Sequence, residues 1–116
     1  TKDLLHSDAG GVYQRWANNM GFEGTPPSRN ALRPPGEWNT LDILFRSPRM
    51  SGSQKLEKAR FVEVRLNGVV VQRNVEVSGP TRASMFENES PTGPLMLQGD
   101  HGPVYFRNVW IWPRQL

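Results

Sequence analysis

The stretch RFVEVRLNGVVVQRNVEV, residues 60–77, decides the fold of this chain of 116 residues. Its first part alternates between apolar and charged side chains, which places Val62, Val64 and Leu66 on one face of a strand. Asn-Gly follows, and then a second β-branched run. Asn-Gly between two such runs is typical of a type I′ hairpin, because both central residues of that turn need a positive φ. The stretch therefore predicts two antiparallel strands joined by a tight turn.

Outside this hairpin, shorter alternating runs predict further strands. No segment repeats apolar residues with the 3.6-residue period of a helix, so we expect at most a turn or two of helix. The expected strands cover residues 12–16, 38–45, 60–66, 69–77, 94–98 and 104–112. The segments between them, rich in Gly, Pro, Ser and Asn, are expected to be loops over residues 18–35, 47–58 and 78–94. The sequence thus predicts an all-β, antiparallel protein of about six strands.

Composition excludes several classes of protein. The chain has no Cys, which rules out disulfide scaffolds, thiolate zinc sites and cysteine nucleophiles. No apolar run approaches the ~18–20 residues that cross a bilayer, so we expect no membrane partner. Lys and Arg number 14 against 11 Asp and Glu, and the cations are spread along the chain without a basic stripe. Since nucleic-acid binders usually cluster their cations, we expect no nucleic-acid partner either.

The predicted last strand, residues 104–112, is apolar on both of its faces. Val104, Phe106 and Trp110 alternate with Tyr105 and other apolar side chains. Such a strand needs cover on both sides, as in the middle of a β-sandwich. Six strands leave too little for that cover, so we expect either one part of a larger domain or a chain completed by another subunit.

Three stretches together resemble one known family. They are RPPGEWNTLDILFRSPR (residues 33–49), VRLNGVVVQRNVEVSGPT (residues 64–81) and GPLMLQGDHGPVYFRNVWIWP (residues 93–113). In this order they are similar to the 3-keto-disaccharide hydrolases, which are also described as 3-keto-glucoside lyases and hydratases. DAGGVYQRW, residues 8–16, extends the likeness. The resemblance implies a jelly-roll β-sandwich of the concanavalin-like lectin and glucanase type, of which residues 1–116 would form the C-terminal part.

The resemblance also implies an activity. The family acts on glycosides that carry a ketone at sugar C3, so the expected partner is an oxidised glycoside or oligosaccharide. The ketone acidifies the C2 proton, a base removes it, the C1 substituent leaves, and water adds to the product. This chemistry needs a base, an acid for the leaving oxygen, and hydrogen-bond donors or a divalent metal ion on the carbonyl. The family further implies an exported protein.

Asp100 and His101 are the first candidates for this chemistry. They stand between two glycines in Gly-Asp-His-Gly, after the expected strand at residues 94–98. His101 is a candidate base or metal ligand, and Asp100 can orient the imidazole or bind a divalent cation. We expect the pair to open into the hollow of a curved sheet. The alternative is an ordinary β-turn in which Asp100 caps the backbone.

Glu37 is a second candidate catalytic carboxylate, because it stands where the long loop enters the strand expected at residues 38–45. Its alternative role is an ion pair with an arginine such as Arg33 or Arg107.

Four side chains are candidate contacts to the sugar: Gln98, Arg33, Arg107 and Trp16. Aromatic faces stack on the C–H face of a pyranose, and Trp16, which precedes the long loop, is the aromatic residue we expect to be exposed. Further possible platforms are Tyr13, Trp38, Trp110 and Trp112, but such side chains are more often core residues in a sandwich.

Two further classes of function stay open. A jelly roll also hosts non-catalytic carbohydrate-binding modules, because a fold does not fix an activity. An interaction half that pairs with a missing half-domain or forms a homo-oligomer is the third possibility.

Overall fold

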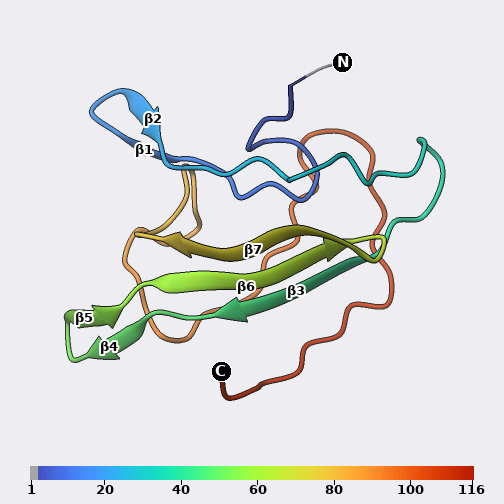
Figure 1. Cartoon of the computed structure of the whole chain (residues 1–116). Coiled ribbons are helices and arrows are strands. Elements are labelled where there is room, and N and C mark those ends of the chain that lie inside the picture. The colour runs from blue at the N-terminus through green and yellow to red at the C-terminus, as the bar shows by residue number, and fades with distance from the viewer. Residues whose placement is uncertain (1–2) are drawn as a thin grey trace.

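The computed structural model describes residues 3–116, which form seven strands and no helix (Figure 1). No helix long and apolar enough to cross a membrane therefore occurs in this part of the chain. Every strand pairing is antiparallel. The all-β, antiparallel prediction is confirmed, and the jelly-roll arrangement stays a prediction. The strands are β1 (Arg15–Ala17), β2 (Met20–Phe22), β3 (Leu41–Arg46), β4 (Arg49–Ser51), β5 (Gln54–Glu57), β6 (Ala59–Leu66) and β7 (Val69–Val77).

The central sheet has the strand order β3-β6-β7, and the tight turn between β6 and β7 is formed as predicted. Asn67 and Gly68 have φ values of 52° and 80°. The Asn67 side chain also accepts a hydrogen bond from the backbone N–H of Thr40 (2.9 Å) and donates one to the carbonyl of Ala31 (2.8 Å). One turn residue thereby ties the hairpin to the start of β3 and to the long segment before it.

The core lies on one face of this sheet. Val64, Leu66 and Val71 are at most 4% exposed. Gly10, with a φ of +86°, lies directly over Val71, since a Cβ at that glycine would stand 2.8 Å from a Val71 methyl group. A glycine is needed there both for the positive φ and for the close approach. Four partly buried apolar residues complete the cluster: Ala9, Ala31, Phe61 and Val69.

The segment before β3 runs along the outer edge of β7, which Figure 1 shows as the blue-green chain beside that strand. The N–H of Ser28 donates to the carbonyl of Val71 (3.0 Å). Gln72, a polar residue only 4% exposed, donates from its side-chain amide to two carbonyls of this segment and to one carbonyl that precedes β1. The acceptors are the carbonyls of Gly10 (3.2 Å), Thr25 (3.0 Å) and Pro26 (3.0 Å). One buried side chain thereby supplies hydrogen-bond donors to backbone oxygens of two irregular segments and ties both to β7.

Strand β3 forms the other edge of the sheet. Its apolar side chains pair across the sheet with those of β6, Leu41 with Leu66 and Ile43 with Val64, which confirms the predicted alternation. Leu41 and Ile43 nevertheless remain about half exposed. The sheet therefore has a packed region near β7 and a partly open apolar region along β3.

The prediction of strands at residues 94–98 and 104–112 is wrong, because the structure forms no strand after β7, over residues 78–116. Neither segment pairs with another among residues 3–116, and every residue from 91 to 116 is exposed. Alternation supplies a face to bury, but a strand also needs a neighbour for its backbone hydrogen bonds. The radius of gyration of 14.9 Å exceeds the ~13 Å typical of this chain length, in keeping with an extended C-terminal segment.

The other boundaries also shift. Of the strand expected at residues 12–16, only a bridge between Val12 and Thr25 and the strand β1 are formed. Strand β2 lies inside the expected loop at residues 18–35, and the β4–β5 hairpin inside the one at residues 47–58. A short hairpin needs only a turn and a few paired residues. Its strands are therefore too short to show a clear alternation of apolar and polar residues in the sequence.

Candidate functional site

Gln98, Asp100 and His101 form one compact polar cluster. Oδ1 of Asp100 lies 2.7 Å from Nδ1 of His101 and 2.8 Å from Nε2 of Gln98. Nε2 of Gln98 also lies 3.2 Å from Nδ1 of His101. The sequence brings the three together because they fall within four consecutive residues.

The shared carboxylate oxygen of Asp100 determines which nitrogen atoms of this cluster carry the hydrogen-bonding protons. A carboxylate only accepts, so the amide of Gln98 and Nδ1–H of His101 both donate to Asp100. The contact between Gln98 and His101 is then one between two donors and not a hydrogen bond. This tautomer leaves Nε2 of the imidazole with its lone pair free. The hydrogen bond from Gln98, followed by that from His101, holds the pKa of Asp100 below its ordinary value.

The cluster is open to solvent. The side chains of His101 and Asp100 are 80% and 72% exposed, and they lie on the strand-free segment at residues 91–116. The strand ends that were expected to place them in the hollow of a curved sheet are not formed. A divalent ion would find one carboxylate and one imidazole, already bonded to each other, and residues 3–116 hold no group of three or more His, Cys, Asp or Glu that could bind a metal. One carboxylate and one imidazole are too few ligands to hold a divalent ion by themselves.

Arg33, Glu37 and Arg107 form a second group, gathered around Trp38. The guanidinium of Arg107 lies over the Trp38 ring at 3.9 Å, and Nη1 of Arg33 donates to the Trp38 carbonyl (3.1 Å). Glu37 precedes Trp38 in a turn in which its N–H donates to the carbonyl of Pro34 (3.2 Å). Neither arginine pairs with Glu37, so its alternative role as an ion-pair partner is not formed in the described chain. The carboxylate is exposed and free.

Trp16 stands apart from both groups. It lies on β1, 43% exposed as expected, with the guanidinium of Arg82 over its ring at 3.9 Å. A different aromatic pair is more exposed: Trp110 and Trp112 stack with ring centroids 6.0 Å apart and planes 6° from parallel, and each is 70% exposed. The sequence left these two open as sugar platforms but favoured a core position for each, and their exposure contradicts the core position.

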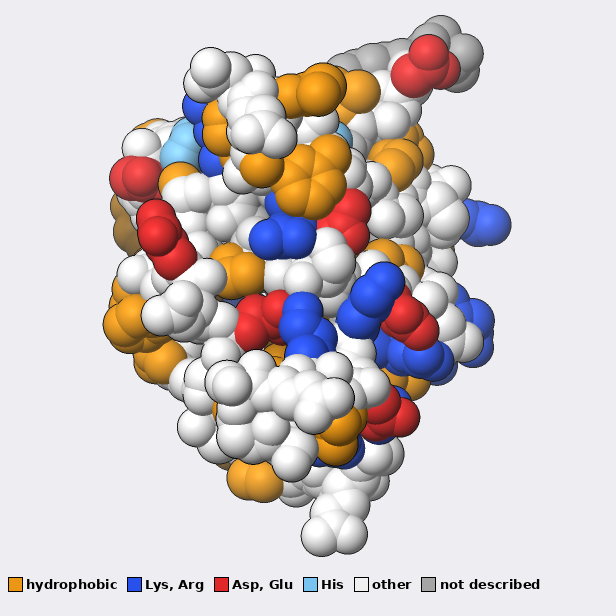
Figure 2. All heavy atoms as spheres, turned by 90° about the vertical axis from the view of Figure 1, so that its left-hand side faces the viewer, with side chains coloured by type: hydrophobic (Ala, Val, Ile, Leu, Met, Phe, Trp, Pro, Cys, Tyr) orange, Lys and Arg blue, Asp and Glu red, His pale blue; other side chains and the backbone are white. Residues whose placement is uncertain are grey.

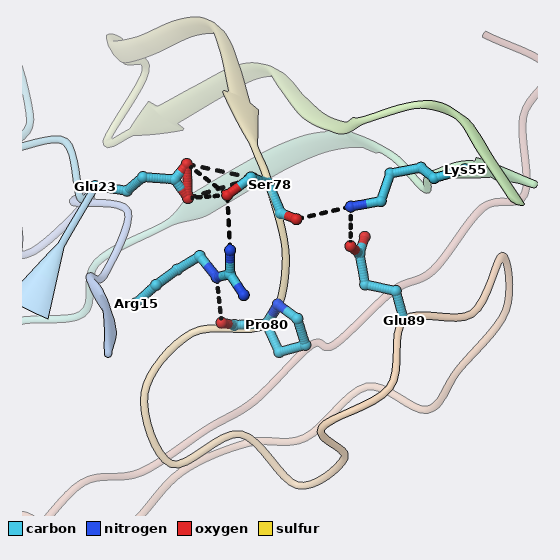
Figure 3. A network of polar contacts seen from close by, with 6 residues as sticks. All are labelled: Arg15, Glu23, Lys55, Ser78, Pro80 and Glu89. Atoms are coloured by element: carbon cyan, nitrogen blue, oxygen red, sulfur yellow. Dashed lines mark hydrogen bonds and ion pairs between the residues drawn. The ribbon is translucent and has the colours of Figure 1, made fainter. Parts of the chain in front are cut away.

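A polar network that the sequence did not predict centres on Ser78 (Figure 3). The Ser78 hydroxyl accepts from Nη1 of Arg15 (2.8 Å) and donates to Glu23 (2.7 Å). The Ser78 carbonyl accepts from Nζ of Lys55 (2.7 Å), which also forms an ion pair with Glu89. These residues are far apart in the sequence, so no local pattern could have revealed the network.

A family model, described as the 3-keto-alpha-glucoside-1,2-lyase-like domain, matches residues 2–112. The match covers nearly the whole chain and includes both groups of candidate site residues and Trp16. The chain belongs to this family. No curated protein and no solved structure matches it.

Proposed function

We propose that the chain carries out the elimination of the C1 substituent from 3-keto-glycosides, followed by hydration of the product. Membership of the lyase-like family supports this class of reaction. The single observation that carries the mechanism is the hydrogen bond of 2.7 Å between Asp100 and Nδ1 of His101. It orients the ring and leaves the other nitrogen free to accept a proton.

In the first step Nε2 of His101 takes the C2 proton, which the neighbouring C3 ketone acidifies. The C–H electron pair forms the C1–C2 double bond, and the C1–O bond breaks with its electrons going to the leaving oxygen. Asp100 stabilises the imidazolium that results, since its carboxylate stays ionised. Removal of such a base lowers rates by ~10²–10⁴-fold in general acid–base catalysis.

The leaving oxygen needs a proton, and the ketone needs donors for the charge that builds up on it. Glu37 is the proposed proton donor, because its carboxyl group lies next to Trp38, is open to solvent and forms no ion pair with Arg33 or Arg107. The guanidinium groups of Arg33 and Arg107 are the proposed donors to the substrate oxygens. In the second step water adds across the double bond, with its hydroxyl at C1 and its proton at C2, to give the free 3-keto sugar.

The test is the release of the aglycone from an aryl 3-keto-glucoside, assayed with and without added divalent metal. We expect His101→Ala to lower the rate by about 10²-fold or more. His6→Gln, at the only other histidine, is the matched control and is expected to keep the rate. Equal rates for His101→Ala and the unmodified chain would contradict the assignment of the base.

A non-catalytic carbohydrate-binding module is the second candidate, and the exposed Trp110–Trp112 pair favours it. Parallel aromatic faces offer stacking surfaces to pyranose rings without any acid or base. Binding of the 3-keto-glucoside without turnover, abolished by Trp110→Ala and unaffected by His101→Ala, would replace the lyase with the module.

A further inference from the structure

A cavity of about 470 Å³ lies between the β4–β5 hairpin and residues 88–91. We call it the hairpin cavity. Its volume falls within the ~300–1,000 Å³ of small-molecule sites. None of the candidate catalytic or sugar-contacting residues lines it. The polar side chains that do are those of Ser53, Lys55, Asn88, Glu89 and Ser90.

The charge of the cavity is balanced. Lys55 and Glu89 are the charged residues that line it, and they form an ion pair with each other. A phosphate would have to compete with Glu89 for the ammonium, and a metal cation would have to compete with Lys55 for the carboxylate. The same mixture of signs is visible on this end of the molecule in Figure 2, where Lys and Arg side chains lie beside Asp and Glu. An uncharged ligand is therefore favoured over an ionic one.

The ion pair keeps unused hydrogen-bonding capacity. The ammonium of Lys55 has three donors, of which the Ser78 carbonyl and Glu89 take two. Glu89 uses one of its two oxygens in that pair. One free donor beside one free acceptor fits two neighbouring hydroxyl groups, one accepting from the ammonium and one donating to the carboxylate. In the described chain the side chains of Ser53 and Asn88 make no hydrogen bond and add further groups for hydroxyls.

The cavity wall is held in place before any ligand binds. The side chains of Lys55 and Glu89 are only 29% and 16% exposed. The Ser78 carbonyl that positions Lys55 belongs to the network of Figure 3, where Arg15 and Glu23 fix the same serine. Such preorganisation lowers the entropic cost of binding.

From this geometry we propose that the hairpin cavity binds a neutral polyhydroxylated molecule, a sugar ring with vicinal hydroxyls, at a site separate from Asp100 and His101. The proposal does not depend on the lyase reaction. It requires only a ligand with adjacent hydroxyl groups and no charge.

The test uses methyl α-D-glucopyranoside, which lacks the C3 ketone and so is not a substrate for the proposed elimination. Titrated into the ¹⁵N-labelled full chain at up to about 50 mM, it is expected to shift the amide resonances of Ser53, Lys55 and Asn88. Cyclohexanol, with one hydroxyl, sodium phosphate and magnesium chloride are expected to leave these resonances in place. Glu89→Gln is expected to weaken sugar binding by about tenfold, while Glu87→Gln, an exposed acid two residues away, leaves it unchanged.

Ser53 lies on the exposed turn of the hairpin. Ser53→Ala is therefore the second variant, for use if Glu89→Gln disturbs the loop. We expect it to weaken sugar binding by about threefold. The absence of sugar-dependent shifts around the cavity would overturn the proposal. So would shifts confined to residues 98–112, or shifts at Lys55 and Glu89 caused by phosphate or magnesium but not by the sugar. An unchanged rate of aglycone release in His101→Ala would overturn the lyase proposal and leave this result untouched, so the two proposals fail separately.

Discussion

The central sheet and the C-terminal segment, residues 91–116, have similar sequences and different structures. Both are rich in apolar, β-branched and aromatic residues, which alternate with charged ones in β6 and occupy both faces of residues 104–112. In the sheet, Val71 is 2% exposed, whereas Val109 in the C-terminal segment is 52% exposed. The difference lies in hydrogen-bonded neighbours. Strands β6 and β7 pair through a two-residue turn, while residues 91–116 pair with no other described segment. Alternation therefore predicts a strand only where a partner strand is close at hand.

The largest expected difference between the two regions is in the cost of removing a valine side chain. Val71→Ala leaves a cavity beneath Gly10 and should lower the free energy of unfolding by about 2–3 kcal/mol. Val109→Ala, the same change at an exposed position, should cost less than about 0.5 kcal/mol. Urea unfolding followed by circular dichroism measures both. Equal losses would mean that the C-terminal segment is packed as tightly as the sheet.

The second comparison concerns buried and exposed amides. Gln72→Leu removes the donor for three carbonyls, although Thr25 keeps a hydrogen bond from the N–H of Val12. We expect a loss of about 1–2 kcal/mol, because the carbonyls of Gly10 and Pro26 are left without a donor. The matched change Gln115→Leu, at an exposed position, should lie within about 0.5 kcal/mol of the unmodified chain. A neutral Gln72→Leu would show that water reaches these carbonyls.

The same contrast explains what the sequence could predict of the fold. The Asn67–Gly68 turn and its two strands were predicted because the signal, an Asn-Gly pair between two β-branched runs, lies within 18 consecutive residues. The association of the segment around Gly10 with β7 was not predicted, since it depends on a glycine, a buried glutamine and carbonyls that are more than 40 residues away in sequence. Long-range packing of irregular backbone leaves no periodic pattern.

In the candidate site too, contacts between sequence neighbours could be predicted and contacts between distant residues could not. The contact between Asp100 and His101 could be predicted because the residues are adjacent. The sequence singled out Arg33 and Arg107 as alternative ion-pair partners of Glu37, but it did not indicate that both contact the neighbouring Trp38. The pair of Lys55 and Glu89 was missed, because each looks like an ordinary surface charge until the fold brings them together across 34 positions.

The smallest expected effect is a change in one titration, and it separates local from long-range electrostatics. The pKa of Asp100 is lowered first by the hydrogen bond from Gln98 and then by that from His101. A carboxyl whose pKa is lowered by folding stabilises the folded state above its ordinary pKa, and that contribution is lost as the pH falls through the lowered value. Gln98→Ala should therefore raise the pKa of Asp100 towards its ordinary value. The pKa of Glu63 in β6, lowered chiefly by a hydrogen bond from Arg65, should stay as it is and serves as the control in the same carboxyl NMR titration.

If the pKa of Asp100 does not move, the cluster of Gln98, Asp100 and His101 does not persist in solution, and the orientation of the imidazole must come from elsewhere. If both pKa values move, Gln98 is coupled to the central sheet, and the two regions are not as independent as their exposure indicates.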